Sequence, residues 1–228
     1  MNKINYQKEL EKLLQKLEQE QGAGKKAPAL FLHSCCAPCS SYVLEYLCGR
    51  FRITVFYFNP NISESAEYVR RVGEQKRLIE AYNREGRGYP ISVIVGDYDP
   101  QLFFQTAQGL EDCPEGGERC FRCFVLRLRE TARRAREGGY DYFGTTLTIS
   151  PLKNAERLNQ IGTALSEEYG ISWLPSDFKK RNGYKRSVEL SEEYGLYRQD
   201  YCGCAFSKAE RELSKAGRAE RGEIVIQR

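Results

Sequence analysis

The chain has 228 residues and a formal net charge of +4, with 29% of its residues charged. So small a net charge excludes a globally basic nucleic-acid-binding protein and leaves room only for a local basic surface. The first residues form a charged amphipathic pattern rather than a signal peptide, and no apolar run is long enough to span a bilayer. We therefore expect a cytoplasmic protein with no membrane partner.

Apolar runs bounded by turn residues predict a series of strands at 29–33, 52–58, 89–95, 141–147 and 171–174. Helical periodicity predicts helices at 3–20, 40–49, 63–84, 150–169 and 187–194. Three further helices are predicted: one starts at Asp99-Pro100, one opens at Cys120–Cys123 and ends near Glu137, and one runs from Ser207 onward. Asp99-Pro100 and Ser150-Pro151 both carry the signature of a helix start, a capping residue followed by proline. The alternation predicts an α/β fold with an open, mostly parallel sheet and helices on both faces.

We expect three parts along the chain. Residues 1–26 form an N-terminal amphipathic helix and a linker, residues 27–216 a catalytic α/β domain, and residues 217–228 a loosely held C-terminal tail. The helix at 63–84 is rich in Glu and Arg, and we expect it to be a solvated outer helix.

The turn after the first strand, His33-Ser34-Cys35-Cys36-Ala37-Pro38-Cys39, holds three cysteines and the chain's single histidine. Ligands of open α/β sheets bind at the carboxyl ends of strands, and the turn Asn59-Pro60-Asn61-Ile62 should lie near the same edge. A nucleotide-binding protein would place glycines in the first turn so that backbone could approach phosphate. Thiols in their place indicate metal or redox chemistry.

The chain has nine cysteines, an odd number that argues against a fully paired disulfide framework. Cys120 and Cys123 open a helix and, together with Cys35 and Cys36, would supply the four thiolates of an iron–sulfur cluster. Zinc is the competing interpretation, although adjacent cysteines make a poor zinc knuckle. The plain alternative is burial as small apolar residues, which is how we interpret Cys48.

Cys202-Gly203-Cys204 differs in kind from the other cysteine groups. Two cysteines around one glycine can close a small, strained and easily reduced disulfide. The alternative is a ligand pair for a second metal, together with Cys39. Cys113 belongs to none of these groups.

A basic segment at 178–186 surrounds Phe178 and Tyr184 with the cations Lys179, Lys180, Arg181, Lys185 and Arg186. Cations for phosphates and aromatic faces for bases are typical of a single-stranded RNA contact. The alternative is an ordinary solvated charged loop.

Five motifs occur together and in order. They are His33-Ser34-Cys35-Cys36-Ala37-Pro38-Cys39-Ser40, Pro114-Glu115-Gly116-Gly117-Glu118-Arg119-Cys120-x-x-Cys123, Thr145-Thr146-Leu147, Ser176-Asp177-Phe178-Lys179-Lys180 and Tyr201-Cys202-Gly203-Cys204. In this combination the chain resembles the QueH-type epoxyqueuosine reductases over about residues 28–208. The resemblance implies a nucleotide-alpha-hydrolase-like (HUP-like) α/β domain whose phosphate loop is replaced by cysteines.

The resemblance also implies the last step of tRNA queuosine biosynthesis, the two-electron removal of the epoxide oxygen of epoxyqueuosine at the wobble position. Carried over, Cys35, Cys36, Cys120 and Cys123 ligate a [4Fe-4S] cluster, and Cys202 and Cys204 form a redox-active pair. A second mononuclear metal, iron, with Cys39 as a candidate ligand, would act as a Lewis acid on the epoxide oxygen. Asp177 is the catalytic candidate outside the cysteines, with Tyr184 and Tyr201 as other candidate proton donors.

The expected partners are tRNA containing epoxyqueuosine, bound through its anticodon loop, and an electron donor that the sequence does not identify. Two alternatives remain open at this point. One is another iron–sulfur tRNA-modifying enzyme, such as a thiolase, although the chain lacks the glycine-serine ATP loop that such an enzyme would need. The other is a zinc-stabilised RNA-binding module without catalysis.

Overall fold

A computed structural model describes residues 4–220 of the chain. Its centre is one parallel sheet made of β1 (Ala29–His33), β2 (Arg52–Tyr57), β3 (Ser92–Val95), β4 (Tyr142–Thr145) and β5 (Ser172–Trp173). The strands lie in the order β3-β2-β1-β4-β5 and every pairing is parallel. The structure confirms the open α/β sheet, while the HUP-like assignment stays a prediction.

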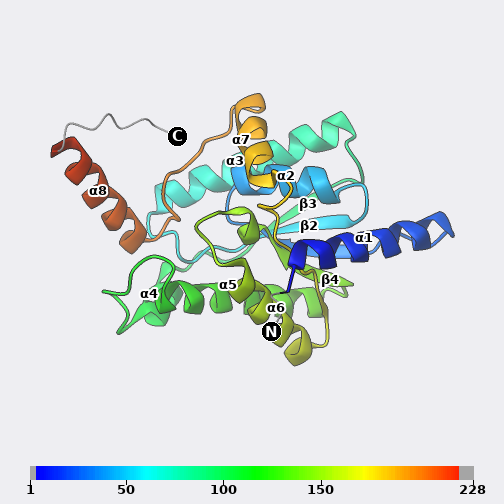
Figure 1. The fold of residues 1–228 in the computed structure, drawn as a ribbon, viewed down its shortest axis with the longest axis horizontal. Helices are drawn as coiled ribbons and strands as arrows, with labels where there is room; N and C mark the ends of the chain where they lie inside the picture. The colour runs from blue at the N-terminus through cyan, green and yellow to red at the C-terminus, as the bar shows by residue number, and fades with distance from the viewer. Residues whose placement is uncertain (1–3, 221–228) are drawn as a thin grey trace.

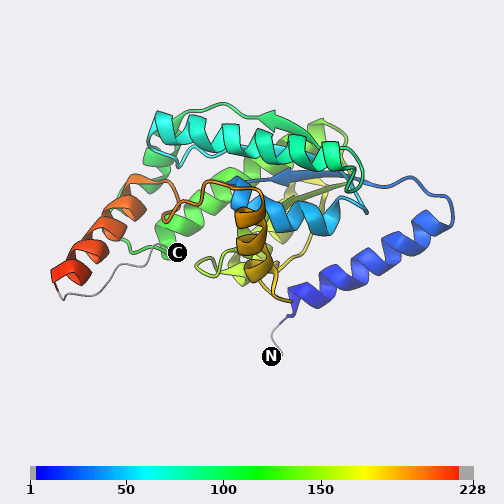
Figure 2. The ribbon, with the colours of Figure 1, turned by 90° about the horizontal axis from the view of Figure 1, so that it is seen from above.

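The helices are α1 (Tyr6–Gly22), α2 (Ala37–Leu47), α3 (Ser65–Glu85), α4 (Pro100–Ala107), α5 (Glu118–Glu137), α6 (Ala155–Tyr169), α7 (Gly183–Glu193) and α8 (Ala205–Glu220), with a 3₁₀ turn at Thr146–Ile149. Figure 1 shows α2, α3 and α7 on one side of the sheet and α5 and α6 on the other. Turned by 90°, Figure 2 shows α1 and α8 extending from opposite ends of the body.

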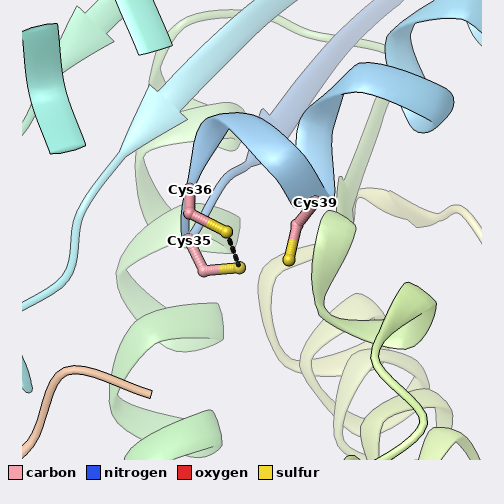
Figure 3. Close-up of side chains that lie close together, drawn as sticks. All are labelled: Cys35, Cys36 and Cys39. Atoms are coloured by element: carbon pink, nitrogen blue, oxygen red, sulfur yellow. Dashed lines mark hydrogen bonds between the residues drawn. The ribbon is translucent and has the colours of Figure 1, made fainter. Parts of the chain in front are cut away.

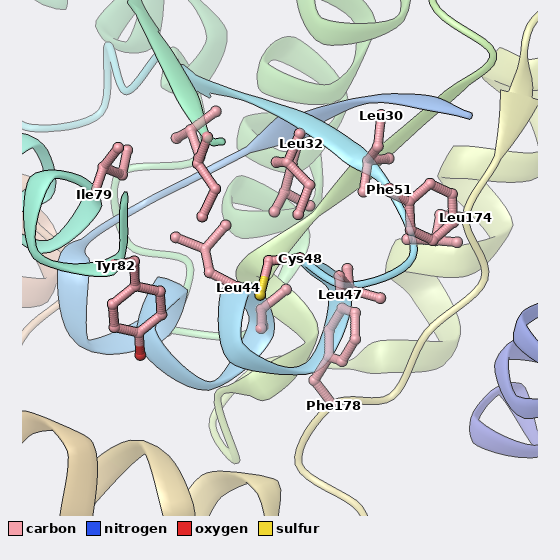
Figure 4. Packing of buried hydrophobic residues seen from close by; sticks show 14 of the residues in the cluster. Leu30, Leu32, Leu44, Leu47, Cys48, Phe51, Ile79, Tyr82, Leu174 and Phe178 are labelled. Atoms are coloured by element: carbon pink, nitrogen blue, oxygen red, sulfur yellow. The ribbon is translucent and has the colours of Figure 1, made fainter. Parts of the chain in front are cut away.

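Alternation along the strands divides the core between the two faces, because successive strand side chains point to opposite sides. Leu30 and Leu32 of β1 pack with residues of α2 and α3 in one cluster, where Cys48 is also buried, as expected (Figure 4). Phe31, between them in sequence, packs with the buried residues of α5 and α6 in a second cluster. Leucines of α1 complete the first cluster, so the N-terminal helix packs on the domain.

Three predicted helix boundaries are wrong. The helix predicted from 40 begins at Ala37, because Pro38 fits the first turn, where its missing N–H leaves no bond unmade. The helix predicted from 150 begins at Ala155, because the side chain of Asn154, not that of Ser150, accepts a hydrogen bond from the first turn, here from the N–H of Arg157. The helix predicted from 187 begins at Gly183.

Two further expectations need correction. Helix α3 is not wholly solvated, because Arg71 and Gln75 on its inner face are buried. Helix α8 continues to Glu220, past the predicted start of the tail, and the rest of that tail lies outside the described residues. Between residues 4 and 220, no helix combines the length and the apolar character needed to cross a membrane.

The strand order changes direction between β1 and β4. Chain order runs outward from β1 in one direction through β2 and β3, and in the other through β4 and β5. A crevice therefore opens between the carboxyl ends of β1 and β4, where open α/β sheets bind their ligands. Cys35 follows β1 and the 3₁₀ turn follows β4, so both lead directly into this crevice.

Candidate metal and redox site

Cys35, Cys36 and Cys39 form one compact group at the end of β1. Their sulfurs all lie within 4.8 Å of one another, an arrangement that could hold a metal ion. Figure 3 shows the three side chains pointing into the same space from the start of α2. Cys36 is the N-cap of α2 and Cys39 lies in its first turn, so the positive end of the helix dipole faces these sulfurs and favours thiolates.

The three thiols of this group differ in acidity. Hydrogen bonds with Cys36 and Cys39 lower the pKa of Cys35 well below its ordinary value, and the positive charges of Lys153 and Arg127 add to this effect. The same contact with Cys35 raises the pKa of Cys36 to about 11 and also raises that of Cys39. Cys35 is thus the most acidic thiol of the metal-free group.

A second group of thiols surrounds a cavity of about 100 Å³ beside the first. Cys120 and Cys123 reach it from the first two turns of α5, and Cys202 and Cys204 reach it from the loop before α8. The cavity wall also contains Asn61, which confirms that the turn after β2 lies near the site. The cavity therefore brings Cys120 and Cys123 together with Cys202 and Cys204, whereas Cys35 and Cys36, their predicted partners in a cluster, are not part of its wall.

Cys202 and Cys204 are both free thiols in this structure, with sulfurs 3.4 Å apart. The contact with Cys204 lowers the pKa of Cys202 to about 6, while Cys204 is shifted in the opposite direction. Gly203 has a φ of 113°, in the region that favours glycine, and a Cβ there would lie 2.8 Å from Ile62. Arg71 donates to the Cys202 carbonyl oxygen at 3.1 Å, which holds the turn in place.

Two cationic side chains, Arg127 and Lys153, lie near both cysteine groups. Arg127 is 3% exposed, and its side chain contacts Asn61 at 3.0 Å, His33 at 3.4 Å and the sulfur of Cys123 at 3.7 Å. Burial disfavours the charged form of Lys153, but the thiols of Cys35, Cys39 and Cys202 outweigh it and raise the pKa of this lysine. The positive charges of Arg127 and Lys153 therefore interact electrostatically with sulfurs from both cysteine groups.

Arg127 has an unusual surrounding for a buried cation. Among the described residues no carboxylate forms an ion pair with it, and its Nη2 has no hydrogen-bond partner. A buried charge without a counter-charge is costly, so the cavity is suited to an anionic group. Several thiolates, alone or holding a metal centre, have the negative charge that this surrounding lacks.

The sequence comparisons agree with this chemistry. A family model for epoxyqueuosine reductase QueH matches residues 30–210. The chain belongs to the epoxyqueuosine reductase QueH family. It is 44% identical over 207 residues to the epoxyqueuosine reductase QueH of Staphylococcus epidermidis, covering 90% of this chain and 85% of the relative.

More distant members of the QueH family also match over most of their length. The relative from Streptococcus pyogenes serotype M1 is 43% identical over 90% of this chain and 78% of its own. The relative from Thermotoga maritima is 35% identical over 80% of this chain and 91% of its own. The similarity therefore covers the whole α/β domain rather than a single motif.

The other predicted site residues lie away from the cavity wall. Asp177 forms an ion pair with Lys179 at 2.9 Å and is not among the cavity-lining residues. Tyr184 is exposed on α7, and Tyr201 lies against Arg71, whose guanidinium carbon is 5.3 Å from the ring centroid. Cys113 does not line the cavity either. The catalytic role of Asp177 stays a prediction.

The basic segment at 178–186 is not a continuous loop, because α7 begins at Gly183. A Cβ at this position would overlap the carbonyl oxygen of Phe178, so glycine is needed where the helix begins. Three of its cations are engaged: Lys179 with Asp177 at 2.9 Å, Arg181 with Glu11 at 3.0 Å and Arg186 with Glu45 at 2.8 Å. RNA binding by this segment stays a prediction.

Sequence reasoning missed Arg127, Lys153 and Arg71. Arg127 follows Cys123 by four residues, which places both side chains on one face of α5 and could have been noticed. Lys153 follows β4 by eight positions, through the 3₁₀ turn that the strand prediction had included. Arg71 carried no signal, because α3 contains many exposed arginines.

Proposed function

We propose that this chain reduces epoxyqueuosine in tRNA to queuosine. Epoxyqueuosine reductase is the name of the family and of its relatives. The observation that carries the proposal is the pair of cysteine groups at the switch point of the sheet, with the buried Arg127 beside them, for which the described residues offer no carboxylate partner. We further propose that the chain acts in the cytoplasm.

The reaction breaks both C–O bonds of the epoxide, takes up two electrons and two protons, and yields an alkene and water. The electrons would come from a one-electron reductant that the chain does not contain. Such chemistry needs a redox centre beside a small cavity, and the cysteines around the cavity support this proposal.

Within this proposal, Cys35, Cys36, Cys120 and Cys123 hold a [4Fe-4S] cluster, which delivers electrons one at a time. The fit rests on the charge of the cavity, because Arg127 and Lys153 offset the negative charge of several thiolates. Cys39, beside Cys35 and Cys36, is the proposed ligand of a second mononuclear iron. Cys202 and Cys204, held by Arg71, face the cavity as the proposed redox pair.

The chain's own residues then orient the reaction. Phe103, Phe121 and Phe124 line the cavity and restrict water around the epoxide. Asn61 and Arg127 are placed to bind polar groups at its inner end. Asp177 remains the proposed proton donor outside the cysteines, and it would have to approach the cavity after substrate binds.

The test is anaerobic purification followed by turnover. We expect a brown protein with iron and sulfide, which converts epoxyqueuosine to queuosine in tRNA with a chemical reductant, detected by mass spectrometry of the digested nucleosides. A colourless protein that contains only zinc and binds RNA would identify an RNA-binding module. A brown protein that adds sulfur to tRNA instead would identify a thiolase.

A further inference from the structure

A second hollow lies next to the cysteine cavity, between α5 and α6. It has a volume of about 610 Å³ and is wider and shallower than the cavity. Phe121 lines both spaces, so the groove and the cavity lie on either side of this residue. The groove therefore begins where a substrate would enter.

Three arginines stand along this groove. Arg122 and Arg129 lie two turns apart on α5, and Arg157 faces them from the first turn of α6. Val125, Ile161 and Ala164 contribute apolar surface between them. Cations around an apolar floor match a strand that presents phosphates and base faces together.

The arginines are available for a ligand. Arg122 is 3.7 Å from Glu118 and Arg129 is 3.4 Å from Glu168, and all four side chains are about half exposed. Long, exposed ion pairs of this kind contribute little to stability, so a ligand phosphate can replace the carboxylate easily. Arg157 has no ion-pair partner among the described residues, and its guanidinium carbon lies 5.1 Å from the ring centroid of Phe121.

The rim of the cavity has a matching feature. Leu152 lines the cavity, yet its side chain is 73% exposed. An exposed apolar side chain beside a small cavity is suited to the face of a nucleobase. In contrast, the segment at 178–186 has its Arg181 and Arg186 in shorter ion pairs, with Glu11 and Glu45.

We infer that the groove between α5 and α6 binds the RNA strand next to the modified nucleotide, with its phosphates on Arg122, Arg129 and Arg157. This inference rests on the proposed function, because it takes tRNA as the substrate. The strand would continue from the groove past Phe121 and Leu152, which brings the wobble nucleotide to the cysteine cavity.

The test measures, by fluorescence anisotropy at several KCl concentrations, how tightly the protein binds an unmodified transcript of a queuosine-type tRNA. The groove variant Arg122→Gln/Arg129→Gln/Arg157→Gln is compared with Lys76→Gln/Arg84→Gln/Arg136→Gln, which removes three exposed cations elsewhere. We expect at least a tenfold weaker affinity in the groove variant. The slope of log affinity against log salt should fall by about two units, at about 0.7 per lost phosphate contact. The control should stay within about twofold of wild type, since it removes no expected phosphate contact.

Several outcomes would overturn the inference. Unchanged affinity and slope in the groove variant would do so, as would a loss confined to the variant Lys179→Gln/Lys180→Gln/Arg181→Gln. A groove variant that alters self-association in sedimentation but not tRNA affinity would identify a protein interface instead. If the triple variant fails to fold, Arg157→Gln alone should still weaken binding severalfold.

The readouts also separate this inference from the proposed function. Affinity for unmodified tRNA involves no turnover, so it reports only on the groove. Wild-type protein with a full cluster that binds tRNA but never converts epoxyqueuosine would contradict the proposed function and leave the groove intact. If the wild-type protein converts epoxyqueuosine but tRNA affinity does not depend on the groove arginines, only the inference about the groove is contradicted.

Discussion

The guanidinium of Arg127 lies 3.7 Å from the sulfur of Cys123, a residue that precedes Arg127 by one turn on α5. A fixed positive charge so close to a bound redox centre stabilises its reduced, more negative state. At an effective dielectric of about 20, one charge at about 5 Å is worth about 3 kcal/mol, or on the order of 100 mV. Arg127→Gln should therefore lower the midpoint potential of the proposed cluster by a shift of that order.

The matched control for this prediction is Arg133→Gln, on the same helix but only partly buried and engaged with Glu130 and Glu137. Arg127→Lys keeps the charge and should shift the potential much less than Arg127→Gln. The measurement is a redox titration followed by visible absorbance and electron paramagnetic resonance. Equal potentials in Arg127→Gln and Arg133→Gln would show that Arg127 does not tune the centre.

The second prediction concerns the ligands. Cys36→Ser and Cys123→Ser should each remove most of the iron and sulfide, because a serine hydroxyl is a poor ligand for this centre. Far-ultraviolet circular dichroism should change little. Cys48→Ser is the control, since Cys48 is buried in the core away from both groups. Wild-type iron and sulfide in both ligand variants would show that the assignment is wrong.

The position of the central strand could be predicted from the sequence because it has an apolar run that its two buried faces require. Leu30, Phe31 and Leu32 leave no other use for the segment than a buried strand. Helix starts were less predictable where two signatures compete. Ser150-Pro151 and Asn154 both resemble caps, and only the packed 3₁₀ turn decides that the chain stays irregular up to Lys153.

The site could be predicted as far as its cysteines, and not as far as its cations. Cysteines in three separate motifs predict metal or redox chemistry because thiols have few other uses in such a pattern, and the structure places them in two neighbouring groups. An arginine in a helix has many uses, and burial of Arg127 depends on its place opposite His33 and Asn61. Whether Arg181 and Arg186 are free for RNA likewise depends on Glu11 and Glu45, which are distant in sequence.

The third prediction concerns acid stability. His33 is buried between Thr145 and the carbonyl of Phe58, and burial lowers its pKa from 6.5 to about 3. The unfolded chain binds the proton at higher pH than the folded chain. Stability from this group is therefore complete above about pH 6.5 and is lost as the pH falls towards 3, by about 1.4 kcal/mol per unit.

His33→Gln should be less stable than wild type at pH 7, because its hydrogen bonds fit less well. It should lose less stability between pH 6.5 and pH 4.5, by roughly 2–3 kcal/mol. Urea unfolding of metal-free protein at three pH values measures the difference. The chain has one histidine, so no other imidazole contributes. Parallel pH profiles for the two proteins would contradict the prediction.

The last prediction concerns Cys202 and Cys204, and it tests mechanism rather than family. Their sulfurs lie 3.4 Å apart, and Arg71 and Gly203 hold the turn between them. A disulfide there would close a very small ring, whose strain makes it easy to reduce. Such a pair suits an electron relay better than a structural link. Ligation of a metal by the same two sulfurs is the alternative role.

Cys204→Ser should keep the iron–sulfur signal and tRNA affinity but lose turnover of epoxyqueuosine. Mass spectrometry of oxidised wild-type protein should find a Cys202–Cys204 linkage that mild reduction removes. Cys113→Ser is the control, because Cys113 lies outside the cavity wall, and it should keep full turnover. Full turnover in Cys204→Ser would exclude both roles. Two results together would favour metal ligation. The inactive Cys204→Ser protein would lose one non-cluster metal ion, and the oxidised wild-type protein would never form the Cys202–Cys204 disulfide, because thiolates bound to a metal are not free to join.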